Sequence, residues 1–390
     1  MTKSLSVLGA TGSVGTSTLK VIAHSPERYE VNALVAGSNV DGLASACRQT
    51  GAKRAVIGDA GKYSELKSAL AGTGIEVSAG REAVLEVASQ KVDLLVSAMV
   101  GAAGLEPTVD AIKAGSSIAL ANKETMVCAG TIVCELAEKH DVRLLPMDSE
   151  HNAIFQVFEY DSAKAVDKVI VTASGGPFRT SSLEQMRAAT PEMALRHPNW
   201  SMGRRITIDS ASMVNKGLEL IEAFHLFPIT ADQLDVVVHP QSIVHGMVRY
   251  CDGSLLAHMS LPDMCGPIAH CLAYPTRKTA PVAELDLGMI GRLDFEKPDL
   301  ERFPALKLAR DVMELGDAAG TIFNAADEVA VEAFLGRKIG FLQIPELLED
   351  VLNRLHTQNM LDCPDQLDEI LQLDQVARRV ANEVIGKMAA

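Results

Sequence analysis

The chain has 390 residues, of which 47% are hydrophobic and 22% charged, so it can bury two or three cores of ordinary domain size. Its net charge of −14 at neutral pH repels polyphosphates and anionic lipids, which argues against nucleic acid or a membrane as partner. No apolar stretch reaches the ~18–20 residues of a membrane helix, and the first predicted strand begins too early for a signal peptide. The seven cysteines contain no CxxC pair, so we expect a cytoplasmic protein with reduced thiols.

From the N-terminus to residue 147, short β-branched segments alternate with segments of helical length. This alternation is typical of βαβ units, which build a parallel sheet. We therefore predict a Rossmann-like domain over residues 1–147. The expected strands are residues 4–8, 31–36, 54–57, 92–98, 117–121 and 142–146.

Residues 148–273 follow a different pattern, in which a glycine- and proline-rich segment is followed by a helix and two alternating strands. The Asp252-Gly253 pair between those two strands is a strong signal for a β-hairpin. We therefore predict a central α+β catalytic domain with antiparallel strands. Its expected elements are a strand at 169–172, a helix at 211–227 and strands at 243–250 and 255–261.

The last part of the chain is predicted to be helical. Prolines and weak periodicity over residues 274–298 indicate a linker, and the helical periodicity of residues 299–390 indicates a C-terminal helical bundle. The expected helices are residues 305–313, 325–335, 344–355 and 376–388. The whole chain is thus predicted to be an α/β protein with three structural parts and one linker.

Residues 9–15, with the sequence GATGSVG, follow the first predicted strand and open a helix. A glycine loop in this context lets the backbone approach a pyrophosphate, whose charge then faces the helix N-terminus. A plain strand-to-helix turn is the alternative, but three glycines after a first strand favour a dinucleotide. The second strand ends in AGSN at residues 36–39, with no acid to hold ribose hydroxyls, and this favours NADP over NAD.

Two polar clusters are candidates for catalysis. The sequence Asp-Ser-Glu at residues 148–150 follows a predicted strand and could bind a cation, although it would also suit an ordinary helix cap. Asn215 and Glu219 lie four residues apart on a predicted helix, with Lys216 beside them. A solvated helical face with a local Lys–Glu pair is the alternative for the second cluster.

Residues 174–203 have little apolar periodicity, although they lie inside a compact domain. Long segments of this kind are uncommon unless they are functional, so we predict a lid over the site, with a mobile surface loop as the alternative. Asn-Lys-Glu at residues 122–124 follows a further strand and points to the same carboxyl edge of the sheet.

Taken together, these motifs resemble the 1-deoxy-D-xylulose 5-phosphate reductoisomerase family. The resemblance covers essentially the whole chain, because the motifs occur in the family's order and at about its spacing. The matching segments are residues 9–15, 36–39, 122–124, 148–152, 174–178, 197–203, 209–211, 215–219 and 239–242.

The resemblance implies an NADPH-dependent reductoisomerase that also requires Mg²⁺ or Mn²⁺. Such an enzyme rearranges the phosphorylated sugar 1-deoxy-D-xylulose 5-phosphate, by retro-aldol/aldol cleavage or by a direct shift. It then reduces the branched aldehyde to 2-C-methyl-D-erythritol 4-phosphate, a precursor of non-mevalonate isoprenoids. A homodimer is implied in the same way.

The resemblance also implies roles for particular residues. One divalent ion would be held by Asp148, Glu150 and Glu219, and the implied catalytic residues are Lys123, Glu150 and His197. The substrate-binding residues would be Lys123, Ser149, Glu150, Ser174, His197, Trp200, Ser210, Asn215, Lys216 and Glu219, of which Ser174, Ser210, Asn215 and Lys216 form the phosphate-binding set. The cofactor-binding residues would be Thr11, Gly12, Ser13, Val14, Gly37, Ser38, Asn39, Asn122, Glu124 and Gly203. Ser38 departs from the family, which commonly has lysine or arginine at this position.

Three other classes of protein are alternatives. A short-chain dehydrogenase would use Tyr160 and Lys164 on one face of a helix, but we expect a turn there. A semialdehyde dehydrogenase needs a nucleophilic cysteine, whereas Cys128 is expected inside a helix. A non-catalytic NADP-sensing protein has no need of acidic groups that bind a metal.

Overall fold

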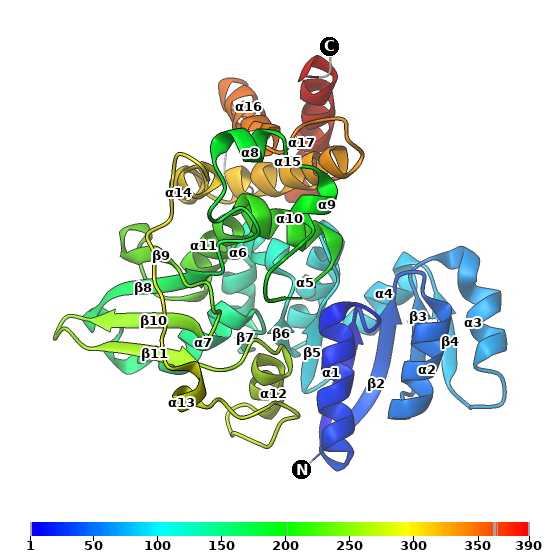
Figure 1. Ribbon diagram of the computed structural model, residues 1–390. Helices are drawn as coiled ribbons and strands as arrows, with labels where there is room; N and C mark the ends of the chain where they lie inside the picture. The colour runs from blue at the N-terminus through cyan, green and yellow to red at the C-terminus, as the bar shows by residue number, and fades with distance from the viewer. Residues whose placement is uncertain (1, 201, 362–363, 365, 389–390) are drawn as a thin grey trace. The chain divides into compact units, whose positions relative to one another are not determined.

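The computed structural model describes residues 2–200, 202–361, 364 and 366–388 (Figure 1). By its internal contacts the chain forms two compact units. The first unit consists of Met1–Thr125, Val133–Asn152 and Asp263–Ala283, and the second of Met126–Ile132, Ala153–Pro262 and Glu284–Ala390. The functional boundaries expected after residues 147, 273 and 298 stay a prediction.

The first unit is built on a parallel sheet whose described strands follow the order β4-β3-β2-β1-β5-β6-β7. The chain runs outward from β1 to β4 and then crosses back to β5, so the direction of winding reverses between β1 and β5. Ligands of open α/β sheets bind beside such a reversal, at the carboxyl ends of the strands. The strands are β1 Lys3–Leu8, β2 Tyr29–Ala36, β3 Arg54–Ile57, β4 Glu76–Ala79, β5 Leu94–Ser97, β6 Ser117–Leu120 and β7 Leu144–Pro146.

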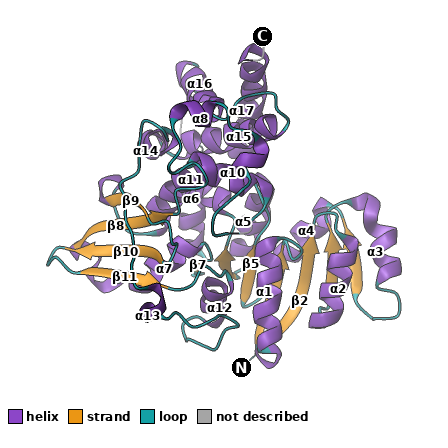
Figure 2. Cartoon of the chain, in the orientation of Figure 1, coloured by secondary structure: helices purple, strands orange, loops and turns teal. Residues whose placement is uncertain are grey.

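Helices cover both faces of this sheet, as a parallel sheet with buried strands requires (Figure 2). Right-handed crossovers place α1, α2 and α3 on one face and α4 and α5 on the other. A later segment, α12, packs beside α1 and against β6, so it extends the first layer. The helices are α1 Ser13–His24, α2 Val40–Thr50, α3 Tyr63–Ala69, α4 Arg81–Ala88, α5 Leu105–Lys113 and α12 Cys265–Ala273. Two more helices, α6 Lys123–Lys139 and α7 Ser149–Val157, contribute residues to both units.

The second unit contains a mixed sheet with the strand order β11-β10-β8-β9. Strand β10 is antiparallel to β8 and β11, whereas β9 is parallel to β8. The tight turn between β10 and β11 contains Gly253 at φ +89°, a backbone conformation that favours glycine, which confirms the predicted hairpin. The strands are β8 Val166–Ala173, β9 Leu234–Val238, β10 Val244–Tyr250 and β11 Leu255–Met259.

The helices of the second unit pack around α15, which contacts α10, α14, α16 and α17. Phe323 and Phe334 of α15 are fully buried and belong to one apolar core that extends to the helices around them. The helices are α8 Leu183–Arg187, α9 Pro191–Ala194, α10 Arg204–Ser212, α11 Val214–Leu226, α13 Leu287–Ile290, α14 Ala305–Leu315, α15 Asp317–Leu335, α16 Gln343–Thr357 and α17 Leu367–Met388.

The predicted fold class is confirmed: an N-terminal parallel sheet with helices, a second sheet with antiparallel pairing and a helical C-terminal region. Several details of the prediction were wrong. Strands β4 and β9 and helix α10 were not expected, and the helix expected at 211–227 is α11, which begins only after Met213 at φ +63°. Among the described residues, none of the helices has the length and apolar character needed to cross a membrane.

Candidate active site

The glycine loop between β1 and α1 is constrained by close backbone contacts. Gly9 adopts φ +87°, and a Cβ atom there would lie 2.2 Å from the carbonyl oxygen of Ala98. A Cβ atom on Gly15 would lie 2.2 Å from the carbonyl oxygen of Gly9, so no other residue fits at either position. Gly12 and Ser13 are exposed where α1 begins. The loop therefore presents accessible backbone to a ligand at the N-terminus of a helix, which suits a pyrophosphate.

The segment after β2 is also accessible to a ligand, because Gly37, Ser38 and Asn39 are all exposed. The Asn39 side chain accepts a hydrogen bond from the backbone N–H of Gly42 at 3.0 Å and so caps α2. The strand itself ends at Ala36 and offers no carboxylate there.

Asn122 and Glu124 are buried and fasten the loop that follows β5. The amide of Asn122 donates to the carbonyl oxygens of Met99 at 2.6 Å and Gly101 at 3.0 Å, and also to the Glu124 carboxylate at 2.8 Å. In turn Glu124 accepts the backbone N–H of Gly101 at 3.0 Å. Both residues therefore stabilise the loop at the carboxyl edge of the sheet. Contact of Asn122 and Glu124 with a cofactor stays a prediction.

Lys123, Asp148, Ser149 and Glu150 form a polar cluster within the first unit. The Lys123 Nζ lies 3.0 Å from one carboxylate oxygen of Asp148, and the backbone N–H of Glu150 donates to the other at 3.1 Å. Ser149 donates to the Glu150 carboxylate. The bond from the Glu150 backbone N–H to Asp148 is a helix cap, the alternative to a cation site that the sequence offered. A helix cap does not require a buried lysine, so capping alone does not explain Lys123.

Asn215, Lys216 and Glu219 lie on one face of α11, in the second unit. Both Asn215 and Lys216 donate a hydrogen bond to the Glu219 carboxylate. The sequence allowed a solvated face here, but that interpretation is wrong, because Lys216 and Glu219 are buried. Charged groups are rarely buried unless they are paired or serve a function.

Gly176 brings the segments that carry Ser174 and Ser210 close together. A Cβ atom on Gly176 would lie 2.8 Å from the carbonyl oxygen of Ser210, so the turn after β8 packs directly on the last residues of α10. The Ser174 hydroxyl lies 3.0 Å from the Nε2 of His197. Ser174, Ser210 and His197 of the expected substrate set therefore belong to one part of the second unit. Gly203 caps the other end of α10.

Trp200 is half-buried, with its ring 6.3 Å from the ring of His245 on β10. A hollow of about 470 Å³ lies between the two ends of the predicted lid, lined by Ser174 and Arg179 on one side and Arg196 and Pro198 on the other. Ser201 falls outside the described residues. The lid segment thus borders an open hollow in the second unit.

The residues that a short-chain dehydrogenase or a semialdehyde dehydrogenase would use are poorly placed for catalysis. Tyr160 and Lys164 lie in the 3₁₀ helix η4, Tyr160–Ala165, which is interrupted by non-helical backbone at Ser162. Residues four apart therefore do not share a face. Cys128 is only 1% exposed inside α6, whereas a nucleophilic cysteine needs access to its substrate.

Two residues that connect the predicted lid to the turn after β9 were not among the expected site residues. Asn199 and Ser242 belong to the matching segments 197–203 and 239–242, and their side chains contact each other at 2.9 Å. The sequence contains both segments, but nothing in it indicates that they touch.

The glycine loop on a doubly wound parallel sheet places this protein in the class of dinucleotide-dependent α/β oxidoreductases. A family model described as 1-deoxy-D-xylulose 5-phosphate reductoisomerase matches residues 5–130, and two models of the C-terminal domains of that family match residues 144–227 and 259–380. The chain belongs to the 1-deoxy-D-xylulose 5-phosphate reductoisomerase family.

Relatives and solved structures of the same name match over nearly their full length. The reductoisomerase of Zymomonas mobilis subsp. mobilis is 48% identical over 388 residues, which are 100% of this chain and 99% of the relative. That of Rhodospirillum centenum is 52% identical and covers 98% of this chain and 94% of its own. A structure of the Zymomonas mobilis enzyme in complex with NADPH is 47% identical, covers 99% of both chains and has a TM-score of 0.93. A crystal structure of a DOX-P reductoisomerase in complex with NADPH, fosmidomycin and magnesium is 43% identical, covers 98% of both chains and has the same TM-score.

Proposed function

We propose that this chain is an NADPH- and divalent-metal-dependent reductoisomerase, which converts 1-deoxy-D-xylulose 5-phosphate to 2-C-methyl-D-erythritol 4-phosphate for isoprenoid synthesis. The observation that carries the proposal is the match to enzymes of this name over the whole chain, at about half of all positions. The glycine loop and the exposed segment after β2 are features that a dinucleotide requires. Homodimeric assembly and a cytoplasmic location stay predictions.

The acidic residues fit a hard divalent cation. Asp148, Glu150 and Glu219 offer carboxylate oxygens, which Mg²⁺ and Mn²⁺ prefer to nitrogen or sulfur. Such an ion, when bound, polarises a substrate carbonyl and orients it beside a neighbouring hydroxyl. The proposal requires the start of α7 and the first turns of α11 to contribute ligands to one ion. Buried Glu219 supports it, because two of the groups that it bonds, the amide of Asn215 and the ammonium of Lys216, could turn to a substrate.

The phosphate group of the substrate would be bound in the second unit. Lys216 supplies one positive charge, and Ser174, Ser210 and Asn215 supply hydroxyl and amide donors, a combination that suits a dianion. Asn215 and Lys216 lie in the first turn of α11, so the helix N-terminus adds favourable electrostatics. In this arrangement Lys216 would exchange its bond to Glu219 for one to the phosphate once Glu219 binds the cation.

Lys123 would fix the geometry at the reacting end. Its ammonium group is buried and bonded to Asp148, so it orients that carboxylate and can also donate to a substrate oxygen. Ser149, bonded to Glu150, constrains the second carboxylate in the same manner. His197 and Trp200 belong to the predicted lid, whose closure would exclude water before hydride transfer.

The direct test is the oxidation of NADPH by the purified chain, followed by absorbance, with 1-deoxy-D-xylulose 5-phosphate and either Mg²⁺ or Mn²⁺. We expect oxidation that depends on both substrate and metal, and a product with the mass of 2-C-methyl-D-erythritol 4-phosphate. Omission of the metal after treatment with EDTA is the matched control. Substrate-dependent oxidation that persists in EDTA would contradict the metal requirement, and no oxidation with either ion would contradict the proposed reaction.

A further inference from the structure

The tip of the predicted lid is fastened to the turn that follows β9. The side-chain amide of Asn199 donates two hydrogen bonds, to the carbonyl oxygen of Pro240 at 2.6 Å and to the hydroxyl of Ser242 at 2.9 Å. Asn199 itself is exposed, so these bonds are not a consequence of burial. A single residue therefore ties residues 197–200 to residues 239–242.

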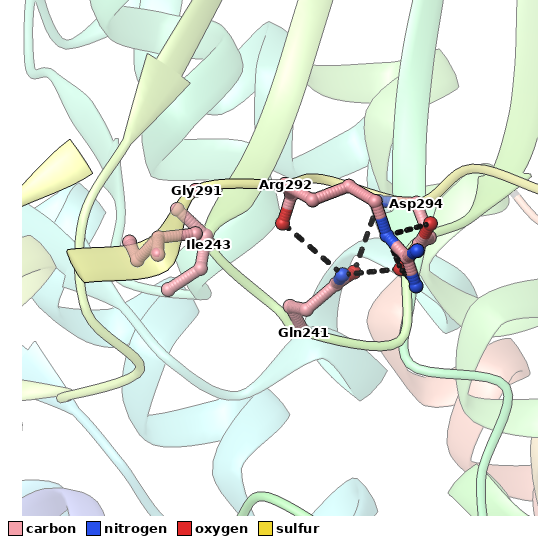
Figure 3. A pocket seen from close by; sticks show the side chains of 6 residues that line it. Gln241, Ile243, Gly291, Arg292 and Asp294 are labelled. Atoms are coloured by element: carbon pink, nitrogen blue, oxygen red, sulfur yellow. Dashed lines mark hydrogen bonds and ion pairs between the residues drawn. The ribbon is translucent and has the colours of Figure 1, made fainter. Parts of the chain in front are cut away.

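The turn at residues 239–242 is a firm support. His239 is fully buried and bonded through Nδ1 to the carbonyl oxygen of Asp294 at 2.8 Å, and its ring stacks on Phe295 at 4.6 Å. Gln241 donates to the carboxylate of Asp294 at 2.7 Å and accepts the backbone N–H of the same residue at 3.2 Å (Figure 3). His239 and Gln241 both bond to Asp294, so the turn that receives the Asn199 amide is itself held by residues 294–295.

The anchored tip determines how His197 hydrogen-bonds. Its Nδ1 accepts the backbone N–H of Asn199 at 3.2 Å and of Trp200 at 2.9 Å. A ring nitrogen that accepts carries no proton, so the proton of the neutral ring is on Nε2. The Nε2 lies 3.0 Å from the Ser174 hydroxyl oxygen, and it is therefore the donor in that bond.

The two hydrogen bonds that the Ser174 oxygen accepts restrict the direction in which its hydroxyl can donate. Its oxygen accepts from His197 Nε2 and also from the backbone N–H of Gly176 at 3.2 Å. A serine hydroxyl has two acceptor positions and one proton, so with both acceptor positions used the proton remains for another partner. In the proposed phosphate site that partner is an anionic oxygen.

We propose that Asn199 is a positioning residue for phosphate binding, which acts through the backbone of residues 199–200 and the His197 ring to aim the Ser174 hydroxyl at the phosphate. Asn199 does not touch the substrate in this scheme. The inference rests on the proposed function for the identity of the substrate, but the contacts that carry it lie entirely within the second unit.

The first test compares Asn199→Ala with the wild-type enzyme in steady-state turnover and in binding of inorganic phosphate. Trp200 is the single tryptophan of the chain, so its emission reports phosphate binding at the tip without any need for turnover. We expect the KM for 1-deoxy-D-xylulose 5-phosphate to rise about tenfold, which corresponds to about 1.4 kcal/mol. The Kd for phosphate should rise by a similar factor. The KM for NADPH should stay constant, and kcat should change much less than the substrate KM.

The matched control is Asn382→Ala, which removes an exposed asparagine whose amide donates to a backbone carbonyl of α17 at 2.8 Å. It should leave all these constants unchanged. Ser242→Ala, which removes one of the two anchors, should give a smaller effect in the same direction. Asn199→Ala added to Ser174→Ala should cause little further loss, because the proposed route ends at Ser174.

Three results would overturn the proposal. Unchanged substrate KM and phosphate Kd in Asn199→Ala would remove the positioning role. A uniform loss of kcat, NADPH binding and thermal stability would mean a structural role only. Full additivity of Asn199→Ala and Ser174→Ala would show that the effect bypasses Ser174. If the wild-type enzyme binds phosphate but does not turn over the sugar phosphate, the proposed reaction fails, while the phosphate measurements still decide the role of Asn199.

Discussion

Lys216 and Glu219 form an ion pair within α11, with side chains that are 5% and 2% exposed. The hydrogen bond from Asn215 also ends on this carboxylate. A buried pair has little net effect on stability compared with apolar residues, because removing both charges from water costs about as much as their attraction returns. The pair is therefore better explained by the site than by the fold, since its two members are the proposed phosphate and metal ligands.

Glu219→Gln should weaken metal binding and slow turnover. The amide keeps the shape of the side chain and can still accept from Asn215, but it removes one negative charge from the proposed metal site. The loss should be on the order of 10–100-fold in metal affinity or more, as for loss of a supporting residue at other metal sites. The measurement is the Mg²⁺ dependence of NADPH oxidation. Glu314→Gln on the exposed face of α14 is the control, and an identical Mg²⁺ dependence in both variants would exclude Glu219 as a ligand.

Ser38→Arg should strengthen the preference for NADPH. Ser38 is exposed directly after β2, where a 2′-phosphate is expected, and serine brings no charge. A charge-assisted hydrogen bond contributes about 1.5–3 kcal/mol, so the KM for NADPH should fall by roughly tenfold or more while that for NADH changes little. Ser45→Arg, on an exposed position of α2, adds the same charge and serves as the control. Equal catalytic efficiency with NADH and NADPH in the wild-type enzyme would refute the inferred preference.

Local sequence patterns were sufficient for the parallel sheet except for its edge strand β4. Strands such as β3 are buried along their whole length and read as short apolar runs between helical segments. Strand β4 escaped prediction because Glu76–Ala79 is an edge strand without a buried face. The break between α10 and α11 was missed because nothing in a methionine signals the left-handed conformation that Met213 adopts.

The candidate site was less predictable than the parallel sheet. Its individual motifs could be recognised in sequence, and the Asn215–Glu219 contact followed from helical spacing. The burial of Lys216 could not be predicted, since it depends on helices that come much later in the chain: Gly217 lets α11 approach α14 so closely that a Cβ atom there would lie 3.0 Å from that of Ala309. Contacts between distant segments, such as that of Asn199 with Ser242, have no local signal at all.

Gly320→Ala should destabilise the protein strongly. Helix α6 has non-helical backbone at Ala129, and the groups freed there are satisfied by α15: Thr321 donates to the carbonyl of Cys128 at 2.9 Å. A Cβ atom on Gly320 would lie 2.0 Å from the carbonyl oxygen of Val127. Overpacking of this kind costs about 1–3 kcal/mol or more, measurable as a lower midpoint in urea unfolding.

The control for this prediction is Gly386→Ala in α17. The space around Gly386 is open, so the same change there meets no neighbour. Alanine has the higher helix propensity, and we expect a neutral effect or a gain of up to about 1 kcal/mol. Equal midpoints for the two variants would mean that α15 and α6 are not in tight contact at Gly320.

Glu328→Gln should lower stability at neutral pH and reduce its loss in acid. Burial alone would raise the pKa of Glu328, but the guanidinium groups of Arg205 and Arg378 outweigh it and hold this pKa below the ordinary value. A depressed carboxylate pKa contributes stability that is complete above the unfolded-state value of about 4.3 and is lost as the pH falls toward the folded-state value. Breaking such a partly buried network costs roughly 3 kcal/mol.

The measurement is urea unfolding from neutral pH down to the acid range, with Glu332→Gln on the exposed side of α15 as control. The wild-type protein and the control should lose stability below about pH 4.3, whereas Glu328→Gln should start lower and change less over that window. A curve for Glu328→Gln that runs parallel to that of the wild-type protein at all pH values would show that this carboxylate does not contribute to acid unfolding.

Binding of substrate should close residues 174–203 over the site. Trp200 is half-buried against His245, so an indole that moves onto a bound ligand would change its surroundings. Additional burial of apolar ring area stabilises the closed form by ~1–2 kcal/mol at about 25 cal/mol per Å², before the cost of ordering the segment. We expect NADPH, Mn²⁺ and a phosphonohydroxamate substrate mimic to shift or quench the Trp200 emission and to slow tryptic cleavage at Arg187 and Arg196. Cleavage at Arg292, whose side chain is 83% exposed outside the lid segment in the second unit, should continue at the same rate and is the internal control. If neither the emission nor the cleavage at Arg196 responds to saturating mimic, the segment is a surface loop and not a lid.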